Sequence, residues 1–327
     1  MCIRDSYCPA CIIVDHKLSK TYCVVEDSEA DLLTRLLQDA HSVTAVDTDP
    51  EKPVLMPRED DSEDYLAGVK RILEYIRSGD VFQVNLSRAW QLQSEQTIEP
   101  SLLFRTLSQS NPAPFACLVH HPMGNIISSS PERLVRQVSD RIETRPIAGT
   151  RPRTHDGQDG QWLEELRTDD KERAEHIMLI DLERNDLGRV CIPGSIEVDE
   201  LMTLESYAHV HHIVSNISGH IRPGVSAIDV IRAVFPGGTI TGCPKVRCME
   251  ILNELENTGR GPYTGSVGYI SNNGSMDFNI LIRTIFQQGE RLHFRAGAGI
   301  VADSVPEREL AETRHKAKGM LLALGAQ

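Results

Sequence analysis

Apolar residues recur at helical spacing most clearly in the segment that follows a run of acidic residues at 59–64. Tyr65, Val69, Ile72 and Ile76 lie three or four residues apart, and this spacing places them on one face of a helix. The residues that the same pattern predicts to be helical are 30–37, 171–187, 244–255 and 306–324. The last two segments begin with proline, which suits the first position of a helix.

Strands are predicted where polar and apolar residues alternate and where short apolar runs lie between turn residues. They are expected at residues 81–86, 115–119, 125–128, 134–138, 210–217, 265–271, 276–286 and 292–302. Helices and strands do not alternate regularly, so the pattern favours an α+β fold with antiparallel sheet and helices on its outer face. The helix at 171–187 carries apolar residues almost all round, Ile177 included, and is predicted to be buried.

Composition narrows the class of protein. The chain has 327 residues, of which 40% are hydrophobic and 25% charged, and its net charge is −13. This acidic balance argues against a nucleic-acid partner, which needs a basic face, and no apolar run is long enough to cross a membrane. The eight cysteines are scattered and no secretory signal is found, so reduced thiols in the cytoplasm are expected.

Two stripes of acidic residues are candidates for a metal site. Glu172 and Glu175 are neighbours on one helix face, and Glu309, Glu312 and Lys316 form a second stripe. Carboxylate pairs of this kind hold Mg²⁺ through oxygen. The alternative is ordinary ion pairing with nearby basic residues, such as a Glu312–Lys316 pair worth about 0.3 kcal/mol.

Two glycine-rich segments and one histidine on a predicted strand are further candidates for a functional site. Residues 235–245 lead directly into a helix, whose free N–H groups favour anions, but they do not match a P-loop. The G-x-G-x-x-A at 297–302 lies inside an apolar run and does not support a dinucleotide site; its glycines would let a ligand approach the backbone. His212, on a predicted strand, is either a general acid or base or a packed structural residue.

Six sequence blocks together match the motifs of a known enzyme family. They lie at residues 145–153, 175–189, 235–245, 260–265, 282–284 and 297–318. In these blocks the chain resembles the chorismate-utilising enzymes: anthranilate synthase component I, aminodeoxychorismate synthase component I, and the isochorismate and salicylate synthases. The resemblance implies one large domain in which two antiparallel sheets pack face to face with helices outside.

The resemblance also implies a magnesium site. In this family Mg²⁺ holds the ring carboxylate of chorismate, and the matching ligands are Glu175 and Glu312. Glu172 and Glu309 match water-mediated partners of the ion. The chemistry agrees, because a hard cation takes oxygen ligands and neutralises a carboxylate that acidic side chains would otherwise repel.

Substrate contacts follow in the same way. Arg283, Tyr263 and the backbone of Gly299 match the residues that grip the enolpyruvyl carboxylate. Lys316 matches a second carboxylate contact.

Three further matches concern the ring and its chemistry. Gly238 and Thr239 match the loop under the chorismate ring. His212 matches the histidine beside the C4 hydroxyl, and Glu132 matches a candidate acid or base. Thr150, in the Pro-Ile-x-Gly-Thr motif, is assigned to the catalytic group with them.

Ala148 bears on which branch of the family the chain resembles. Many aminodeoxychorismate synthases carry a nucleophilic lysine there, and alanine supplies no nucleophile. Residues 237–245 and 277–283 nevertheless look more like that branch. We therefore expect amination of chorismate to 4-amino-4-deoxychorismate, on the folate and p-aminobenzoate pathway, with ammonia from a glutamine amidotransferase partner. Anthranilate synthase component I and a non-catalytic remnant are the alternatives.

The chain is short for this family at its start. Residues 1–60 are weakly patterned, with a predicted linker at 48–53, and are expected to be the remnant of a truncated N-terminal region. Residues 61–327 are expected to form the chorismate-binding catalytic domain.

Overall fold

The computed structural model describes residues 5–44, 55–153, 159–206 and 210–326. The chain divides into two compact units, Met1–Asp49 and Pro50–Gln327. The division lies nearer the N-terminus than residue 60, because residues 55–59 are tied to the second unit. The amide of Leu55 donates to the carbonyl of Leu324, and β3 (Arg58–Glu59) pairs with β4 (Gln83–Gln93).

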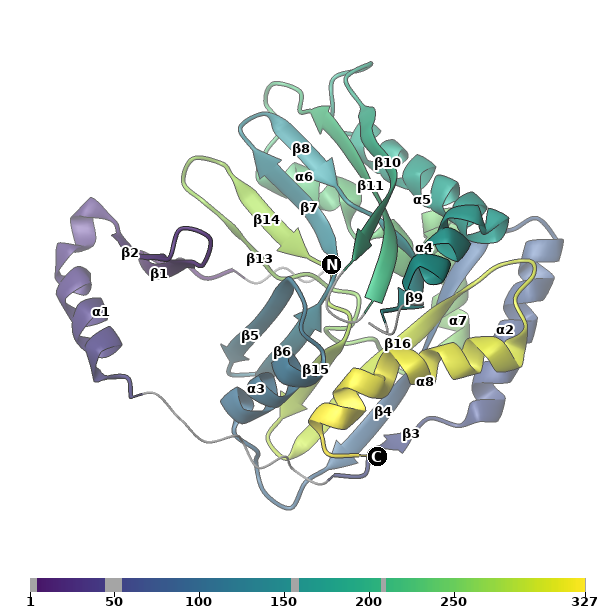
Figure 1. Ribbon diagram of the computed structural model, residues 1–327, viewed down its shortest axis with the longest axis horizontal. Helices are drawn as coiled ribbons and strands as arrows, with labels where there is room; N and C mark the ends of the chain where they lie inside the picture. The colour runs from purple at the N-terminus through teal and green to yellow at the C-terminus, as the bar shows by residue number, and fades with distance from the viewer. Residues whose placement is uncertain (1–4, 45–54, 154–158, 207–209, 327) are drawn as a thin grey trace. The chain divides into compact units, whose positions relative to one another are not determined.

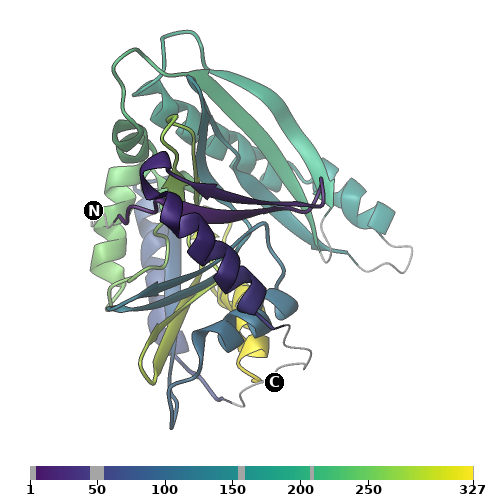
Figure 2. The same cartoon turned by 90° about the vertical axis from the view of Figure 1, so that its left-hand side faces the viewer.

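The first unit is a hairpin and a helix. Strands β1 (Ala10–Asp15) and β2 (Lys20–Val25) pair antiparallel. A 3₁₀ turn then leads into α1 (Ala30–Ser42), which lies beside the hairpin (Figure 2). The predicted helix at 30–37 is confirmed and is longer than expected.

The second unit contains two antiparallel sheets, which we name after their central strands (Figure 1). The β4 sheet has the order β12-β4-β16-β15-β6-β5, with β3 also on β4. Its remaining strands are β5 (Phe115–His121), β6 (Gly124–Ser130), β12 (Gly242–Cys243), β15 (Thr284–Gln288) and β16 (Arg291–Ile300).

The β11 sheet has the order β10-β11-β8-β7-β14-β13, with β9 also on β11. Its strands are β7 (Arg133–Val138), β8 (Arg141–Thr144), β9 (Ile147–Pro152), β10 (Glu197–Ser206), β11 (Val210–His220), β13 (Gly268–Ile270) and β14 (Met276–Asn279). Every strand pairing in both sheets is antiparallel, so the expected α+β class is confirmed.

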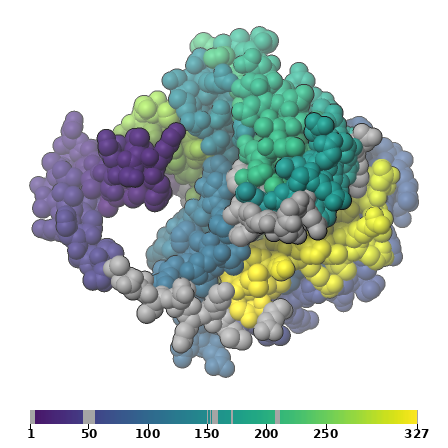
Figure 3. Space-filling view, viewed as in Figure 1, coloured from purple at the N-terminus to yellow at the C-terminus, as the bar shows by residue number. Residues whose placement is uncertain are grey.

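Four helices cover the outer face of the β4 sheet. They are α2 (Ser62–Arg77), α3 (Pro100–Ser110), α7 (Lys245–Leu255) and α8 (Pro306–Ala323). Val84, Leu86 and Trp90 of β4 point toward them and join two apolar clusters. Because side chains alternate along a strand, Gln83, Asn85 and Ser87 lie on the opposite, inner face of the sheet. Figure 3 shows α8, in yellow, on the surface of the unit.

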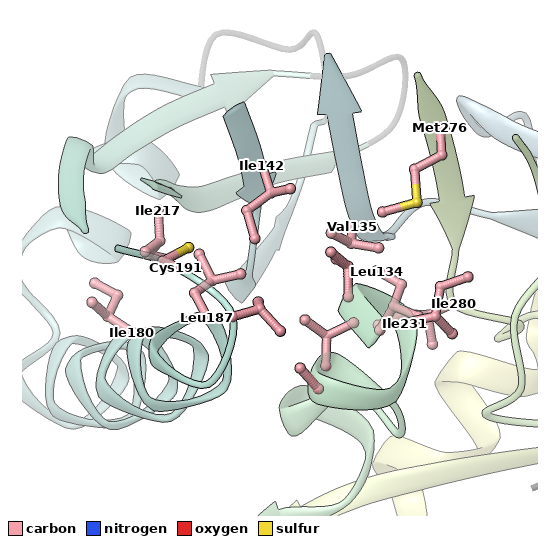
Figure 4. Packing of buried hydrophobic residues seen from close by; sticks show 14 of the residues in the cluster. Leu134, Val135, Ile142, Ile180, Leu187, Cys191, Ile217, Ile231, Met276 and Ile280 are labelled. Atoms are coloured by element: carbon pink, nitrogen blue, oxygen red, sulfur yellow. The ribbon is translucent and has the colours of Figure 1, made fainter. Parts of the chain in front are cut away.

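Two helices cover the β11 sheet. α5 (Asp170–Gly188) and α6 (Ala227–Val234) bury Ile180, Leu187 and Ile231 against Leu134 and Ile217 of the sheet (Figure 4). α4 (Asp159–Thr168) lies beside β9. No helix in the described residues is both long and apolar enough to cross a membrane.

Two sequence predictions need correction. The apolar run at 276–286 is not one strand: β14 ends at Asn279 in the β11 sheet, and β15 begins at Thr284 in the β4 sheet. The link reads as strand because Ile280 and Leu281 are buried within it. The helix at 171–187 is not buried all round, since Ile177 is 44% exposed.

Candidate active site

The inner face of the β4 sheet forms a polar wall. Gly297 and Gly299 of β16 pair with Ser87 and Asn85 of β4. A Cβ on Gly299 would lie 2.5 Å from Nε2 of Gln83, and one on Gly297 would lie 2.7 Å from Oδ1 of Asn85. The side chains of Gln83 and Asn85 therefore lie directly against the backbone of β16 at these two glycines.

Two buried amides on this wall were missed by the sequence analysis. Oε1 of Gln83 and Oδ1 of Asn85 are buried and make no hydrogen bond among the described residues, although Nδ2 of Asn85 donates to the carbonyl of Thr239. A buried acceptor without a donor is costly, so each atom needs a donor from outside the described residues. The alternation of polar residues at 83, 85 and 87 in a buried strand was the available signal.

Glu132 lies between β6 and β7 and is 6% exposed. Burial raises the pKa of its carboxyl group to about 7, although the Thr239 hydroxyl and the positive charges of Lys316 and Arg283 favour the ionised form. Glu132 can therefore both give and accept a proton near neutral pH. Thr239, Lys316 and Arg283, predicted site residues from three other segments, therefore lie within electrostatic range of Glu132.

Arg283 occupies the link that crosses between the two sheets. Its φ of 51° lies in the left-handed region, which is strained for a side chain of this size, and its carbonyl accepts from the amide of Ser129. Its guanidinium group forms no hydrogen bond or ion pair with the part of the chain that the structure describes, and burial lowers its pKa. A half-buried guanidinium whose N–H donors are not used by the described residues is suited to bind a ligand carboxylate.

Lys316 provides a second cation beside the glycine backbone. Its Nζ donates to the carbonyl of Gly297 at 3.1 Å and pairs with Oε1 of Glu312 at 2.7 Å. The ion pair that the sequence analysis gave as the ordinary alternative is therefore present, and it lies at the site.

Tyr263 closes the wall from the other side. The side chain is buried, and its hydroxyl lies 3.0 Å from the position of a Cβ on Gly297. Burial raises the pKa of this hydroxyl to about 12, so it is a neutral hydrogen-bond donor.

His212 of β11 is buried, and its Nδ1 lies 3.2 Å from the carbonyl of Gly149. Since a carbonyl only accepts, Nδ1 carries the proton in this contact and Nε2 keeps its lone pair. Burial lowers the pKa of the ring, and the charge of Arg283 also lowers it. Thr150 pairs with His212 in the strand register, but its side chain lies outside the described residues.

Comparison with known proteins decides the family. The model of the chorismate binding enzyme family matches residues 5–322. The chain belongs to the chorismate-binding enzymes. It is 43% identical over 314 residues to the anthranilate synthase component I-like protein of Synechocystis, covering 96% of this chain and 64% of that protein.

Two other relatives of this chorismate-binding enzyme are named for different activities. It is 48% identical over 289 residues to aminodeoxychorismate synthase component 1 of Bacillus subtilis, covering 88% of this chain and 61% of the relative. The crystal structure of anthranilate synthase component I from Streptococcus pneumoniae matches with a TM-score of 0.84 and 34% identity, over 94% of this chain and 71% of that one. The chain thus spans less than two thirds of the length of the curated relatives named here.

The acidic stripes of this chorismate-binding enzyme are partly paired. Oε1 of Glu172 lies 2.6 Å from Nη1 of Arg151, while its Oε2 is buried and has no hydrogen bond to the residues that the structure describes. Glu309 is buried on α8 and Glu175 lies on α5. No group of three metal-ligating side chains is found within the described residues. The donor chemistry still fits a hard cation, since all four residues offer carboxylate oxygen and Oε2 of Glu172 has no partner among the described residues.

The glycine loop at 235–245 is held from behind by α5. A Cβ on Gly238 would lie 2.5 Å from Cδ2 of Leu182, so helix and loop are in close contact there. Lys245 pairs with the buried Asp186 of the same helix. Glu183 is also buried beside this pair, and burial raises its pKa to about 8. The sequence analysis predicted none of these supporting residues.

Proposed function

We propose that this chorismate-binding enzyme aminates chorismate, giving 4-amino-4-deoxychorismate and water. The observation that carries the proposal is the guanidinium of Arg283, which is half-buried and has no ion-pair partner among the described residues. Chorismate carries two carboxylates. Arg283 and Lys316 supply two cations at one site, and both interact with Glu132.

Arg283 and Tyr263 are assigned to the enolpyruvyl carboxylate, together with the backbone of Gly299. A guanidinium and a neutral phenol each donate hydrogen bonds to a carboxylate. Lys316 is assigned to the second carboxylate. To make this contact, Lys316 must break its ion pair with Glu312. Gly238 and Thr239 are assigned to the face of the ring.

The reaction needs one proton to leave the nitrogen and one to reach the departing oxygen. Ammonia forms the new C–N bond, the C–O bond at C4 breaks, and the hydroxyl leaves as water. His212 is neutral with a lone pair on Nε2, so it can take a proton but has none to give there. Glu132, with a pKa of about 7, is therefore the assigned donor and His212 the assigned acceptor.

Glu175 and Glu312 are the residues that would hold Mg²⁺, with Glu172 and Glu309 in support. When bound, the ion would neutralise the ring carboxylate against these acids. Ala148 lies on β9 opposite Ile213 and offers no nucleophile, so ammonia is proposed to attack the ring directly. A glutamine amidotransferase is the proposed source of ammonia, and the cytoplasm the proposed location.

The test is incubation with chorismate, Mg²⁺ and an ammonium salt at alkaline pH, with the product identified by mass. The expected product keeps its enolpyruvyl group and yields p-aminobenzoate only after a lyase is added. The second candidate is the anthranilate synthase reaction, favoured by the names of two relatives. Anthranilate and pyruvate formed without added lyase would replace our proposal with this one.

A further inference from the structure

Between β12 and β3, the edge of β4 is bonded by a loop and by side chains. β12 pairs with β4 at residues 83–84, and β3 pairs with it at residues 90–91. On the same edge, the amide of Asn85 donates to the carbonyl of Thr241 in the glycine loop at 3.0 Å. The carbonyl of Asn85 and the backbone of Ser87 bond to the side chains of a glutamate and two arginines.

These three side chains form one buried unit. The amide of Ser87 donates to Oε1 of Glu256 at 2.9 Å, and the carbonyl of Ser87 accepts from Nη2 of Arg295 at 3.1 Å. The carbonyl of Asn85 accepts from Nη2 of Arg260 at 2.8 Å. Only 5% of the Glu256 side chain is exposed, and it pairs with Arg260 at 2.7 Å and with Arg295 at 3.4 Å. The two arginines thus supply the cations that a buried carboxylate requires.

Arg260 also reaches residues assigned to chorismate. Its Nη1 donates to the carbonyl of Ile240 at 3.0 Å, directly after Thr239 in the glycine loop. Its Cζ lies 5.6 Å from the centre of the Tyr263 ring, within the range of a cation–π contact. The amide of Tyr263 in turn donates to the carbonyl of Arg260 at 3.1 Å. One guanidinium group therefore contacts β4, the glycine loop and the tyrosine.

The charge of Arg260 acts on the same tyrosine. Burial raises the pKa of the Tyr263 hydroxyl to about 12, and the positive charge of Arg260 opposes that rise. A cation beside a phenol favours the loss of its proton, so the hydroxyl becomes a stronger hydrogen-bond donor to an anion.

We propose that Arg260 is a positioning residue for chorismate, which holds the Tyr263 hydroxyl at a fixed place relative to the glycine loop and β4. Arg260 acts through Tyr263 and not by touching the substrate. This inference rests on the proposed function, in which Tyr263 binds the enolpyruvyl carboxylate. The planar fork of arginine is what the role needs, because its separate nitrogens bond to Glu256, Ile240 and Asn85 together.

The test is a double-mutant cycle between Arg260→Lys and Tyr263→Phe. Lysine keeps the charge but has a single nitrogen, so it cannot reproduce the fork. The Kd for chorismate is measured by titration calorimetry with Mg²⁺ and without ammonium. We expect Arg260→Lys to raise this Kd about tenfold in the parent and by no more than about twofold in Tyr263→Phe, because coupled residues are not additive.

Arg295→Lys is the matched control. Arg295 pairs with the same carboxylate, but it donates to Ser87 and Thr258. The Kd of this variant should stay within about twofold of the parent, since the coupling to Tyr263 is kept. Circular dichroism confirms that each variant is folded. If Arg260→Lys does not fold, Arg260→Gln enters the same cycle, because it leaves Glu256 paired with Arg295.

The outcomes separate this inference from the proposed function. An equal rise in Kd in both backgrounds would overturn it, because Arg260 would then support the fold without acting through Tyr263. An unchanged Kd in a folded Arg260 variant would overturn it as well. A parent that binds chorismate but forms no 4-amino-4-deoxychorismate with ammonium contradicts the proposed function instead, and the binding cycle still decides the role of Arg260.

Discussion

Lys245 and Asp186 form a buried ion pair, with 2.5 Å between Nζ and Oδ2 and only 8% and 1% of the two side chains exposed. Lys245 also donates to the carbonyl of Val234 at 3.1 Å. Val234 directly precedes the glycine loop and Lys245 ends it. One ammonium group therefore joins the two ends of the loop and fixes them to α5.

Lys245→Met should destabilise the fold by about 3–5 kcal/mol, because it leaves the carboxylate of Asp186 buried without a cation. Urea denaturation measures the free energy of unfolding. Adding Asp186→Asn to this variant should recover much of the lost stability. Arg247→Met is the control, since Arg247 pairs with Glu250 near the surface and should cost about 1 kcal/mol or less.

Glu132→Gln should lower kcat by about 100-fold or more, since glutamine cannot deliver a proton. In the parent the donor is the protonated form. As the pH rises through about 7, this form is lost, and kcat/KM for chorismate at a fixed concentration of free ammonia should fall. A profile that stayed flat through this range would remove Glu132 from the role of donor.

Arg283→Ala should raise the KM for chorismate about tenfold or more, because a charge-assisted contact to a carboxylate is worth roughly 1.5–3 kcal/mol. Steady-state kinetics with varied chorismate measures it. The matched control is Arg291→Ala, an exposed arginine of β16. An unchanged KM in Arg283→Ala would place the enolpyruvyl carboxylate elsewhere.

Glu175→Gln and Glu312→Gln should each abolish turnover while leaving the fold intact, because each removes a charged oxygen ligand from the proposed Mg²⁺ site. Activity is measured across a magnesium titration, with and without a chelator. Glu307→Gln, at an exposed position of α8, should behave as the parent. Near-parent activity of either site variant in chelator would refute the metal assignment.

With Ala148 in place of lysine, no covalent adduct with the substrate is expected. Intact-protein mass spectrometry after rapid quenching should show only the mass of the free chain. The matched variant Ala148→Lys restores an amine at this position and shows whether the method detects an adduct there. An adduct on the parent chain would contradict direct attack by ammonia.

The sequence alone determined the elements whose pattern is local. The apolar spacing from Tyr65 to Ile76 predicted α2, and prolines at 244 and 306 marked the starts of α7 and α8 to within one residue. Helical periodicity and capping depend on residues a few positions apart, so a short stretch of the sequence is enough to reveal them. The long motifs likewise identified the family and named most of the candidate site.

Only the tertiary structure decided which of these residues meet. The apolar run around Ile280 gives the same sequence pattern whether it forms one strand or a link between two sheets. It is the link between the two sheets that places Arg283 near Glu132. The Lys245–Asp186 pair joins residues 59 positions apart. Gln83 was read only as a strand residue, because its burial depends on the distant Gly299. Contacts of this kind are set by long-range packing, which no local pattern in the chain records.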